Sequence, residues 1–362
     1  MGLSIIVLVG GLVLLVAGAE LLVRGASQLA RAVGLPPLVI GLTVVAFGTS
    51  APEFAVSLKA GLDGQGGIAV GNVVGSNVFN VLVILGASAL IVPLAVSSQL
   101  IRFDVPVMIA VSGLAWLAAL NGAVERWEGV ALLAGVVVYT AVLIVTGLRR
   151  RGNGVSDAGW PADTSPHPRP RLALSVVLVL AGLGMLVLGS RWLVGGATDL
   201  ARLLGVSDLV IGLTLVAAGT SLPELATSII AALRHERDIA VGNIVGSNIF
   251  NILAVLGGAA AFGGHIDVAP AALKLDIPVM TAVAVACLPI FFTGGRISRW
   301  EGALLLAYYA AYTAYLALAE SQNGAPAALG RTMIWFVLPA TALGIGLSVV
   351  YAARNRMMKK RH

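Results

Sequence analysis

Two glutamates in matching surroundings are the residues of this chain best suited to chemistry. Glu53 ends the segment 48–53, Gly-Thr-Ser-Ala-Pro-Glu, and Glu224 ends the segment 219–224, Gly-Thr-Ser-Leu-Pro-Glu. Both segments interrupt long apolar stretches, and an ionisable side chain at membrane depth marks a functional site by default. The structural alternative is that each proline makes an ordinary kink and each glutamate pairs with a buried basic side chain. The second copy argues against that alternative.

The proline before each glutamate predicts a break in the helix. Pro52 has no N–H group, so the carbonyl of Gly48 loses its helical partner, and helical dihedral angles are disfavoured at Ala51. Broken backbone inside a membrane is tolerated where it lines a cavity or where neighbours satisfy its polar groups. The freed carbonyls and the Thr, Ser and Glu side chains are hard oxygen ligands. Such oxygens suit Ca²⁺ and Na⁺ rather than soft transition metals.

A second polar motif follows each of these segments. Asn72, Ser76 and Asn80 are spaced four residues apart, which stacks them on one face of a helix. The same spacing recurs in the second half at Asn243, Ser247 and Asn251. We expect ligands at four of these positions: Ser76, Asn80, Ser247 and Asn251. The alternative is that the asparagines only join helices by hydrogen bonds, which we expect of Asn77 and Asn248.

Paired glycines accompany this second motif. Gly71 and Gly75, like Gly242 and Gly246, lie four residues apart, as small residues do where membrane helices approach closely. We therefore expect the asparagine-bearing helix of each half to pack directly against a broken helix. That packing would bring the polar oxygens of both motifs together.

The composition places these motifs in a membrane protein. The chain has 362 residues, 58% hydrophobic and 11% charged, with a mean hydropathy of +0.97, whereas soluble domains have about 25% charged residues. Stretches of about 20 apolar residues can cross a bilayer. Such spans are predicted at 3–23, 36–58, 68–92, 104–121, 128–147, 172–194, 208–232, 239–262, 275–293, 301–319 and 333–353. The single cysteine, Cys287, lies in one of them, so no disulfide or thiolate metal site is expected.

The chain repeats itself with one offset. Residues 40–57 align with 211–228, and residues 68–85 align with 239–256, both displaced by 171 positions, as Glu224 is from Glu53. Each half holds an odd number of spans, so the second half should enter the membrane from the opposite side. The predicted fold class is all-α, a polytopic membrane protein of two inverted five-helix repeats with its site at the midplane between them.

The repeat also predicts how the chain is divided. The first five-helix repeat covers 1–147 and the second, inverted repeat covers 172–319. Residues 148–171 form a cytoplasmic linker that is rich in Gly, Pro and charge and too short for a folded domain. Residues 320–362 hold one extra C-terminal transmembrane helix and a basic cytoplasmic tail. The extra helix is either an oligomer contact or a plain anchor, so a homo-oligomer is left open.

The basic residues predict the orientation. If the N-terminus is outside, the arginine run 149–151, most other basic loops and the tail 354–361 all fall inside. The positive-inside rule then gives a multi-pass protein of the cell membrane with its C-terminus in the cytoplasm. The same rule explains the net charge of +6, so we exclude nucleic acid as a partner. The tail either contacts anionic membrane lipid or only determines the topology.

The doubled Gly-Thr-Ser-x-Pro-Glu and Gly-Ser-Asn-x-Phe-Asn motifs resemble the two alpha-repeats of the sodium/calcium exchangers and their prokaryotic relatives in the cation/calcium antiporter superfamily. The resemblance covers residues 1–319. It implies that a calcium site and sodium sites share Glu53 and Glu224, with hydroxyl and carbonyl oxygens from Thr49 and Thr220. It assigns flanking sodium sites to Ser50, Ser221, Ser76 and Ser247 with the backbone carbonyls of Ala46 and Ala217. It places Asn80 and Asn251 at the centre, where some relatives carry an aspartate, so the cation stoichiometry stays open.

The resemblance implies a secondary antiporter that exchanges Na⁺ for Ca²⁺ by alternating access, with no cofactor beyond the transported ions. Two glutamates supply a charge that one Ca²⁺ balances, and Na⁺ ions can occupy overlapping oxygens instead. A proton/cation exchanger would use the same glutamates as proton carriers, although no histidine lies in a predicted span. A channel would need a continuous open path. An intramembrane enzyme would need a histidine or lysine base at membrane depth, which the sequence lacks.

Overall fold

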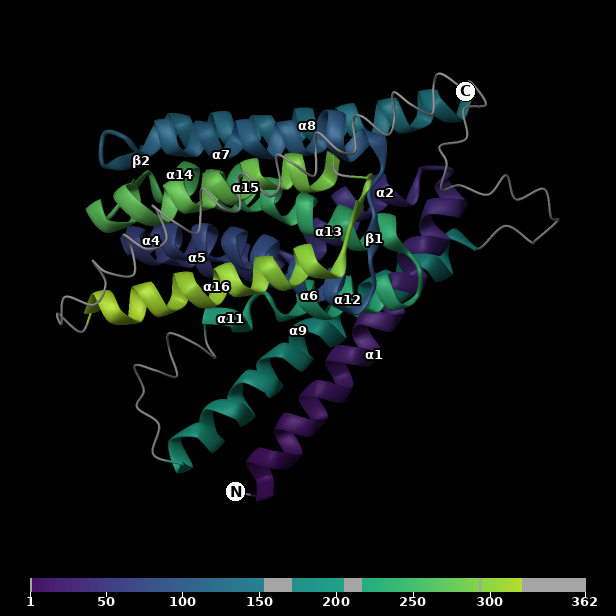
Figure 1. Ribbon diagram of the computed structural model, residues 1–362, viewed down its shortest axis with the longest axis horizontal. Coiled ribbons are helices and arrows are strands. Elements are labelled where there is room, and N and C mark those ends of the chain that lie inside the picture. Colours follow the sequence, from purple (N-terminus) through teal and green to yellow (C-terminus); the bar gives the residue numbers. More distant parts are fainter. Residues whose placement is uncertain (1, 153–170, 205–216, 293, 321–362) are drawn as a thin grey trace.

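The computed structural model describes residues 2–152, 171–204, 217–292 and 294–320. The described part of the chain is overwhelmingly helical, as predicted (Figure 1). The predicted extra transmembrane helix at 333–353 and most of the predicted linker lie outside the described residues, as do the first residues of the predicted span at 208–232.

The first half contains five helical segments. The first is α1 (Gly2–Val33), and the second is broken into α2 (Pro37–Ile40), the π-helical turn η1 (Gly41–Val45), α3 (Ala46–Thr49) and α4 (Ala51–Leu62). The third consists of α5 (Gly66–Phe79), η2 (Asn80–Leu85) and α6 (Gly86–Ile91). The fourth is η3 (Leu100–Asp104) with α7 (Val105–Ala119), and the fifth is α8 (Arg126–Gly152).

The second half repeats this series. It begins with α9 (Leu172–Leu203), which is followed by α11 (Ala217–Gly219) and α12 (Leu222–Leu233). The third segment consists of α13 (Arg237–Phe250), η5 (Asn251–Leu256) and α14 (Gly257–Gly263). The fourth is η6 (Ala272–Asp276) with α15 (Ile277–Phe292), and the fifth is α16 (Arg299–Glu320). Each of the first ten predicted spans therefore overlaps one helical segment.

Several of these segments are long and apolar enough to cross a membrane. Among the described residues, seven meet that test alone, and the broken segment from Pro37 to Leu62 meets it if its two parts are counted as one span. The chain is therefore a multi-pass membrane protein.

Two short β-ribbons, which the sequence did not predict, establish that the second half is inverted. β1 (Leu94–Ala95) pairs with β4 (Arg296–Ile297), and β2 (Ala123–Glu125) pairs with β3 (His265–Asp267). β1 joins the third and fourth segments of its half, whereas β4 joins the fourth and fifth of the other half; β2 and β3 show the converse. Paired loops lie on the same side of the membrane, and this pairing requires the two halves to cross it in opposite directions.

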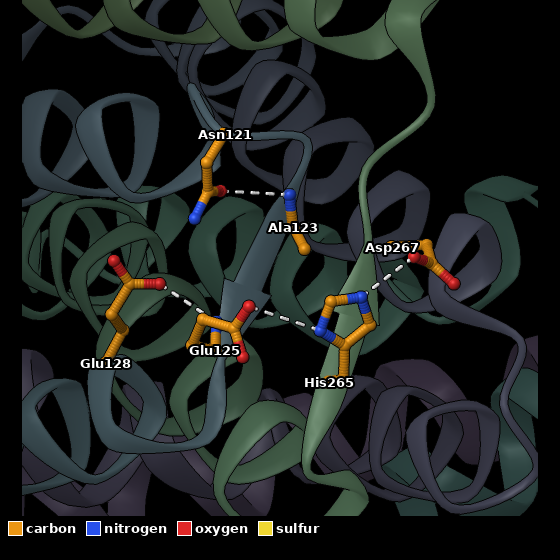
Figure 2. Close-up of polar contacts among 6 residues, drawn as sticks. All are labelled: Asn121, Ala123, Glu125, Glu128, His265 and Asp267. Carbon is orange, nitrogen blue, oxygen red and sulfur yellow. Dashed lines mark hydrogen bonds and ion pairs between the residues drawn. The ribbon is translucent and has the colours of Figure 1, made fainter.

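The β2–β3 ribbon carries an exposed charged cluster (Figure 2). His265 lies between two carboxylates, with Nδ1 3.4 Å from Oε1 of Glu125 and Nε2 3.0 Å from Oδ1 of Asp267. The pKa of His265 is raised, chiefly by its interaction with Glu125 and then by that with Asp267. The ribbon leads directly into α8, where the N–H of Glu125 donates to Oε2 of Glu128 as in a capping box.

Helices α1 and α9 form a tight antiparallel pair that projects obliquely from the remaining helices (Figure 1). Glycines recur every seven residues along the contact. A Cβ atom at Gly18 would lie 2.9 Å from the carbonyl oxygen of Gly182, and one at Gly189 would lie 2.6 Å from the N of Leu15. Because these neighbours are backbone atoms that cannot move aside, the two helices are held together as one unit.

Candidate functional site

Both motif helices break at the serine of the motif. α3 ends at Thr49 and α4 begins at Ala51, with a bend of 48° between the two parts of the segment. Ser50 has φ −81° and ψ 6°, and Ser221 has φ −87° and ψ 5°. The predicted break is confirmed, but it lies at Ser50 and not at Ala51, where the proline was expected to disfavour helical dihedral angles. Pro52 falls in the first turn of α4, where the missing N–H group would have had no helical partner.

The two breaks meet, and each glutamate is held by the other half of the chain. The Ser50 hydroxyl donates to Oε1 of Glu224 over 3.0 Å, and the Ser221 hydroxyl donates to Oε1 of Glu53 over 3.1 Å. Glu53 is 0% exposed and Glu224 is 1% exposed. The internal repeat shows that the two serines correspond to each other, as do the two glutamates, and the structure brings all four side chains into one buried cluster.

No basic side chain neutralises these carboxylates in the described part of the chain. The ion pairs found there involve other acids, namely Glu20, Asp63, Glu125 and Asp267. The buried basic partner that the structural alternative requires is therefore missing among these residues. Nor do three His, Cys, Asp or Glu side chains of the described residues gather to hold a metal ion, so further ligands at the glutamates would have to be neutral oxygens.

Two asparagines position the helices that carry the glutamates. Nδ2 of Asn72 donates to the carbonyl of Glu53 over 3.1 Å and to Oγ of Ser57 over 2.8 Å. Nδ2 of Asn243 makes the equivalent bonds, 3.4 Å to the carbonyl of Glu224 and 2.9 Å to Oγ of Ser228. Each asparagine helix therefore fixes the backbone at the glutamate of its own half, as its predicted packing against the broken helix requires.

A second set of asparagines joins α5 and η2 of the first half to α13 and η5 of the second. Nδ2 of Asn80 donates to Oδ1 of Asn248, and Nδ2 of Asn251 donates to Oδ1 of Asn77, both over 3.1 Å. Asn77 also donates to the carbonyl of Asn248. Asn77 and Asn248 thus join helices, as expected. They also orient Asn80 and Asn251 by engaging the amide nitrogen of each, while its oxygen has no partner in the described part of the chain.

Several buried oxygens of this cluster accept no hydrogen bond from the described residues. They are Oε2 of Glu53, Oε2 of Glu224, Oδ1 of Asn80, Oδ1 of Asn251 and Oγ of Ser247. A buried polar atom left without a partner costs about 1–3 kcal/mol. The cluster therefore concentrates negative and neutral oxygen atoms whose burial is unfavourable unless a cation or a proton engages them.

The remaining expected site residues lie around this cluster. The Thr49 hydroxyl lies 3.1 Å from Oδ1 of Asn243 and 3.4 Å from the carbonyl of Ala46, which also accepts the N–H of Ser50 over 3.0 Å. Ser76 is buried. Thr220 lies at the break between α11 and α12, and Ala217 is the first residue of α11.

The glycine prediction is confirmed for the second half. A Cβ at Gly246 would lie 2.8 Å from Cβ of Ala46, and one at Gly242 would lie 3.1 Å from the carbonyl of Leu38. Gly71 and Gly75 have no such neighbour within 4 Å among the described residues. The repeat counterpart of the segment that contacts Gly242 and Gly246 falls mostly within 205–216, outside those residues.

Two features of the site escaped the sequence. Ser57 and Ser228, which bind the positioning asparagines, end the aligned segments 40–57 and 211–228, so their repetition was a usable signal. The π-helical turns η2 and η5 begin at Asn80 and Asn251 themselves. Such turns are frequent at functional sites, but no residue type in the sequence predicts them.

Comparison with known proteins gives one consistent result. The family model described as sodium/calcium exchanger protein matches residues 3–145 and 174–318. The chain is 44% identical over 268 residues to the putative antiporter CaxA of Alkalimonas amylolytica, covering 73% of this chain and 83% of that protein. It is 33% identical over 299 residues to the sodium/calcium exchanger MaX1 of Methanosarcina acetivorans, covering 74% and 85% respectively.

A solved structure shares the fold. The sodium-calcium exchanger NCX_Mj, soaked with zero Na⁺ and Ca²⁺, superimposes with a TM-score of 0.75 at 32% sequence identity. The match covers 87% of this chain and 99% of that chain. The similarity therefore extends over both halves of the chain.

Proposed function

Because this chain belongs to the sodium/calcium exchanger family, we propose that it is a secondary antiporter that exchanges Na⁺ for Ca²⁺ across the membrane. The family consists of exchangers, so the chain is a transporter and not an enzyme. The observation that carries the proposal is a buried cluster of oxygens around two carboxylates from opposite halves, which accept no hydrogen bond from the residues that the structure describes.

The oxygen types favour Ca²⁺ at the centre. Ca²⁺ takes about 6–8 oxygen ligands from carboxylates, amide oxygens and carbonyls. Glu53 and Glu224 supply two negative charges, which one Ca²⁺ balances. Asn80 and Asn251 donate hydrogen bonds through their amide nitrogens, so their amide oxygens, which have no partner among the described residues, remain for the ion. We assign these four residues to the central site, together with Thr49 and Thr220.

Flanking positions suit Na⁺. A monovalent ion can be held by neutral hydroxyl and carbonyl oxygens beside a shared carboxylate. The serines at the two breaks each touch the glutamate of the other half, so an ion beside one serine would share a carboxylate with the centre. We assign the sodium sites to Ser50, Ser221, Ser76 and Ser247 with the carbonyls of Ala46 and Ala217. Competition between Na⁺ and Ca²⁺ for the shared carboxylates gives antiport.

Alternating access completes the proposal. The glycine-locked pair α1 and α9 would move as one unit across the helices that carry the site, opening it to each side in turn. The proposed division is a first repeat at 1–147, a cytoplasmic linker at 148–171, a second repeat at 172–319, and an extra helix with a basic tail at 320–362. The N-terminus is outside and the C-terminus is cytoplasmic in this proposal.

A flux measurement tests the choice of ions. Purified protein in liposomes should take up radiolabelled Ca²⁺ when a Na⁺ gradient is imposed and should not when only a pH gradient is imposed. Buried carboxylates without basic partners can also be neutralised by protons, which keeps the H⁺/Ca²⁺ exchanger as the competing function. Uptake driven by the pH gradient without Na⁺ would establish that alternative and reject Na⁺ coupling.

A further inference from the structure

Glu20 ties α1 to the end of α12 on one side of the protein. Nη2 of Arg234, just past α12, lies 2.6 Å from Oε1 of Glu20, and Nε of Arg234 lies 3.0 Å from Oε2. Arg24, one turn further along α1, contacts the same carboxylate. The two-point contact with Arg234 therefore links the α1–α9 pair to a helix that carries a site glutamate.

The repeat carries the same pair with its charges exchanged. The displacement of 171 residues that relates Glu53 to Glu224 also relates the contact glycines Gly18 and Gly189. It relates Glu20 to Arg191 on α9, and Asp63 at the end of α4 to Arg234. In the pair that forms, the acid is on α1 and the base follows α12. In the counterpart pair, the base is on α9 and the acid follows α4.

This counterpart pair is not formed in the structure. Asp63 pairs with Lys59 on its own helix, 2.6 Å away. Arg191 is exposed and makes no ion pair with any residue that the structure describes. An arginine within a membrane-spanning helix is costly without a partner or access to water. A state in which Arg191 meets Asp63, the repeat counterpart of Arg234, would supply that partner.

The packing of the helices is asymmetric in the same sense. Both α1 and α9 pack against α12, whereas neither packs against α4 to a comparable extent. In an inverted repeat, the state open to the other side arises when the two halves exchange conformations. In that state α9 would stand to α4 as α1 now stands to α12, which brings Arg191 to Asp63 and withdraws Glu20 from Arg234.

We propose that the two ion pairs alternate. Glu20–Arg234 closes in the state described here, and Asp63–Arg191 closes on the opposite side of the membrane in the other state. Because α1 and α9 are locked together, both pairs cannot form at once. Each acid keeps its neighbour on the same helix, Arg24 or Lys59, and gains or loses the arginine from the facing helix. The inference rests on the alternating access of the proposed function, but not on which cation is carried.

Cysteine cross-linking tests the alternation. In a Cys287→Ala background, we expect mild oxidation to form a disulfide in Glu20→Cys/Arg234→Cys and also in Asp63→Cys/Arg191→Cys. The control Asp63→Cys/Trp192→Cys should stay reduced, because Trp192 faces Gly10 of α1. The variant with all four cysteines should form one disulfide or the other in each molecule, never both. The readout is the number of free thiols per molecule by mass spectrometry.

If Glu20→Cys/Arg234→Cys cross-links while Asp63→Cys/Arg191→Cys stays reduced, or if one molecule holds both disulfides, the alternation is wrong. If both pairs cross-link but the Cys287→Ala protein without added cysteines shows no Na⁺-driven Ca²⁺ uptake, the alternation stands and the proposed cargo is wrong. Should a cysteine pair prevent folding, the charge exchange Asp63→Arg/Arg191→Asp decides. It should restore transport that each single change lowers roughly twofold to fivefold, and failure to restore it would overturn the proposal.

Discussion

The Ser50 hydroxyl in the first half of the chain donates a hydrogen bond of 3.0 Å to Oε1 of Glu224 in the second half. The reverse bond, from Ser221 to Oε1 of Glu53, measures 3.1 Å. Each carboxylate thus has one oxygen engaged by the other half and one, Oε2, without a partner among the described residues. The two halves therefore build one shared site, and a change in either half should affect the whole of it.

Removing one carboxylate should abolish Ca²⁺ exchange. Glu53→Gln or Glu224→Gln leaves a single negative charge for a divalent ion whose dehydration its ligands must offset. We expect Ca²⁺ affinity to fall at least tenfold, about 1.4 kcal/mol, measured by calorimetry and by flux in liposomes. Glu125→Gln, on the exposed β2–β3 ribbon, is the matched control and should behave as wild type. Near wild-type Ca²⁺ flux in either site variant would contradict the proposal that both glutamates bind the same Ca²⁺.

Removing a flanking hydroxyl should weaken Na⁺ more than Ca²⁺. In Ser76→Ala or Ser247→Ala, the Na⁺ concentration for half-maximal flux should rise by more than that for Ca²⁺, because neutral oxygens are the main ligands of a monovalent ion without full counter-charge. Ser112→Ala is the control, since its hydroxyl donates to the carbonyl of Met108 on its own helix. If both site variants keep the wild-type Na⁺ dependence, these serines are packing residues.

Filling the contact between α1 and α9 should destabilise the protein. Gly189→Ala places a methyl group against the backbone of α1, which cannot yield, and overpacking of this kind costs about 1–3 kcal/mol. Gly184→Ala lies on the same helix with nothing within 4 Å among the described residues, so it should be neutral. The melting temperature in detergent, followed by tryptophan fluorescence, compares the two. Equal melting temperatures would show that the close contact does not stabilise the pair.

The β2–β3 ribbon should lose stability as the pH rises. The folded pKa of His265 is raised above its ordinary value of about 6.5 by Glu125 and then Asp267. Its charged form therefore stabilises the fold fully below about pH 6.5, and this contribution is lost as the pH rises through the raised pKa. His265→Gln should melt lower than wild type on the acidic side of that range and alike on the alkaline side. A constant difference at every pH would contradict this.

The proposed orientation predicts which cysteines an impermeant thiol reagent can reach. In Cys287→Ala cells, a cysteine at position 65, in the turn between α4 and α5, should react from outside. Cysteines at 155 and 357, which fall outside the described residues, should be protected until the cells are opened. Labelling of position 155 in intact cells would show that the orientation is opposite to the one proposed, without contradicting the inverted repeat.

The sequence by itself determined most of the architecture. The offset of 171 residues and the odd number of spans in each half predicted inversion, which the ribbon pairing then established. Pro52 and Pro223 predicted the breaks, because a missing N–H group and a steric clash are local effects. Asn77 and Asn248 were expected to join helices for an equally local reason: they lie off the face shared by the ligand positions.

Tertiary structure decided how the repeated parts meet. A repeat supplies every group twice, but only packing determines that Ser50 reaches Glu224 rather than Glu53. It also determined that Asn80 turns its amide nitrogen to Asn248 and its oxygen inward. The same holds for Glu20 and Arg234, which are 214 residues apart and paired in only one of two equivalent places. The motifs repeat with one offset, but the two halves do not make the same contacts in this structure, so which of two matched contacts is formed depends on the positions of the helices.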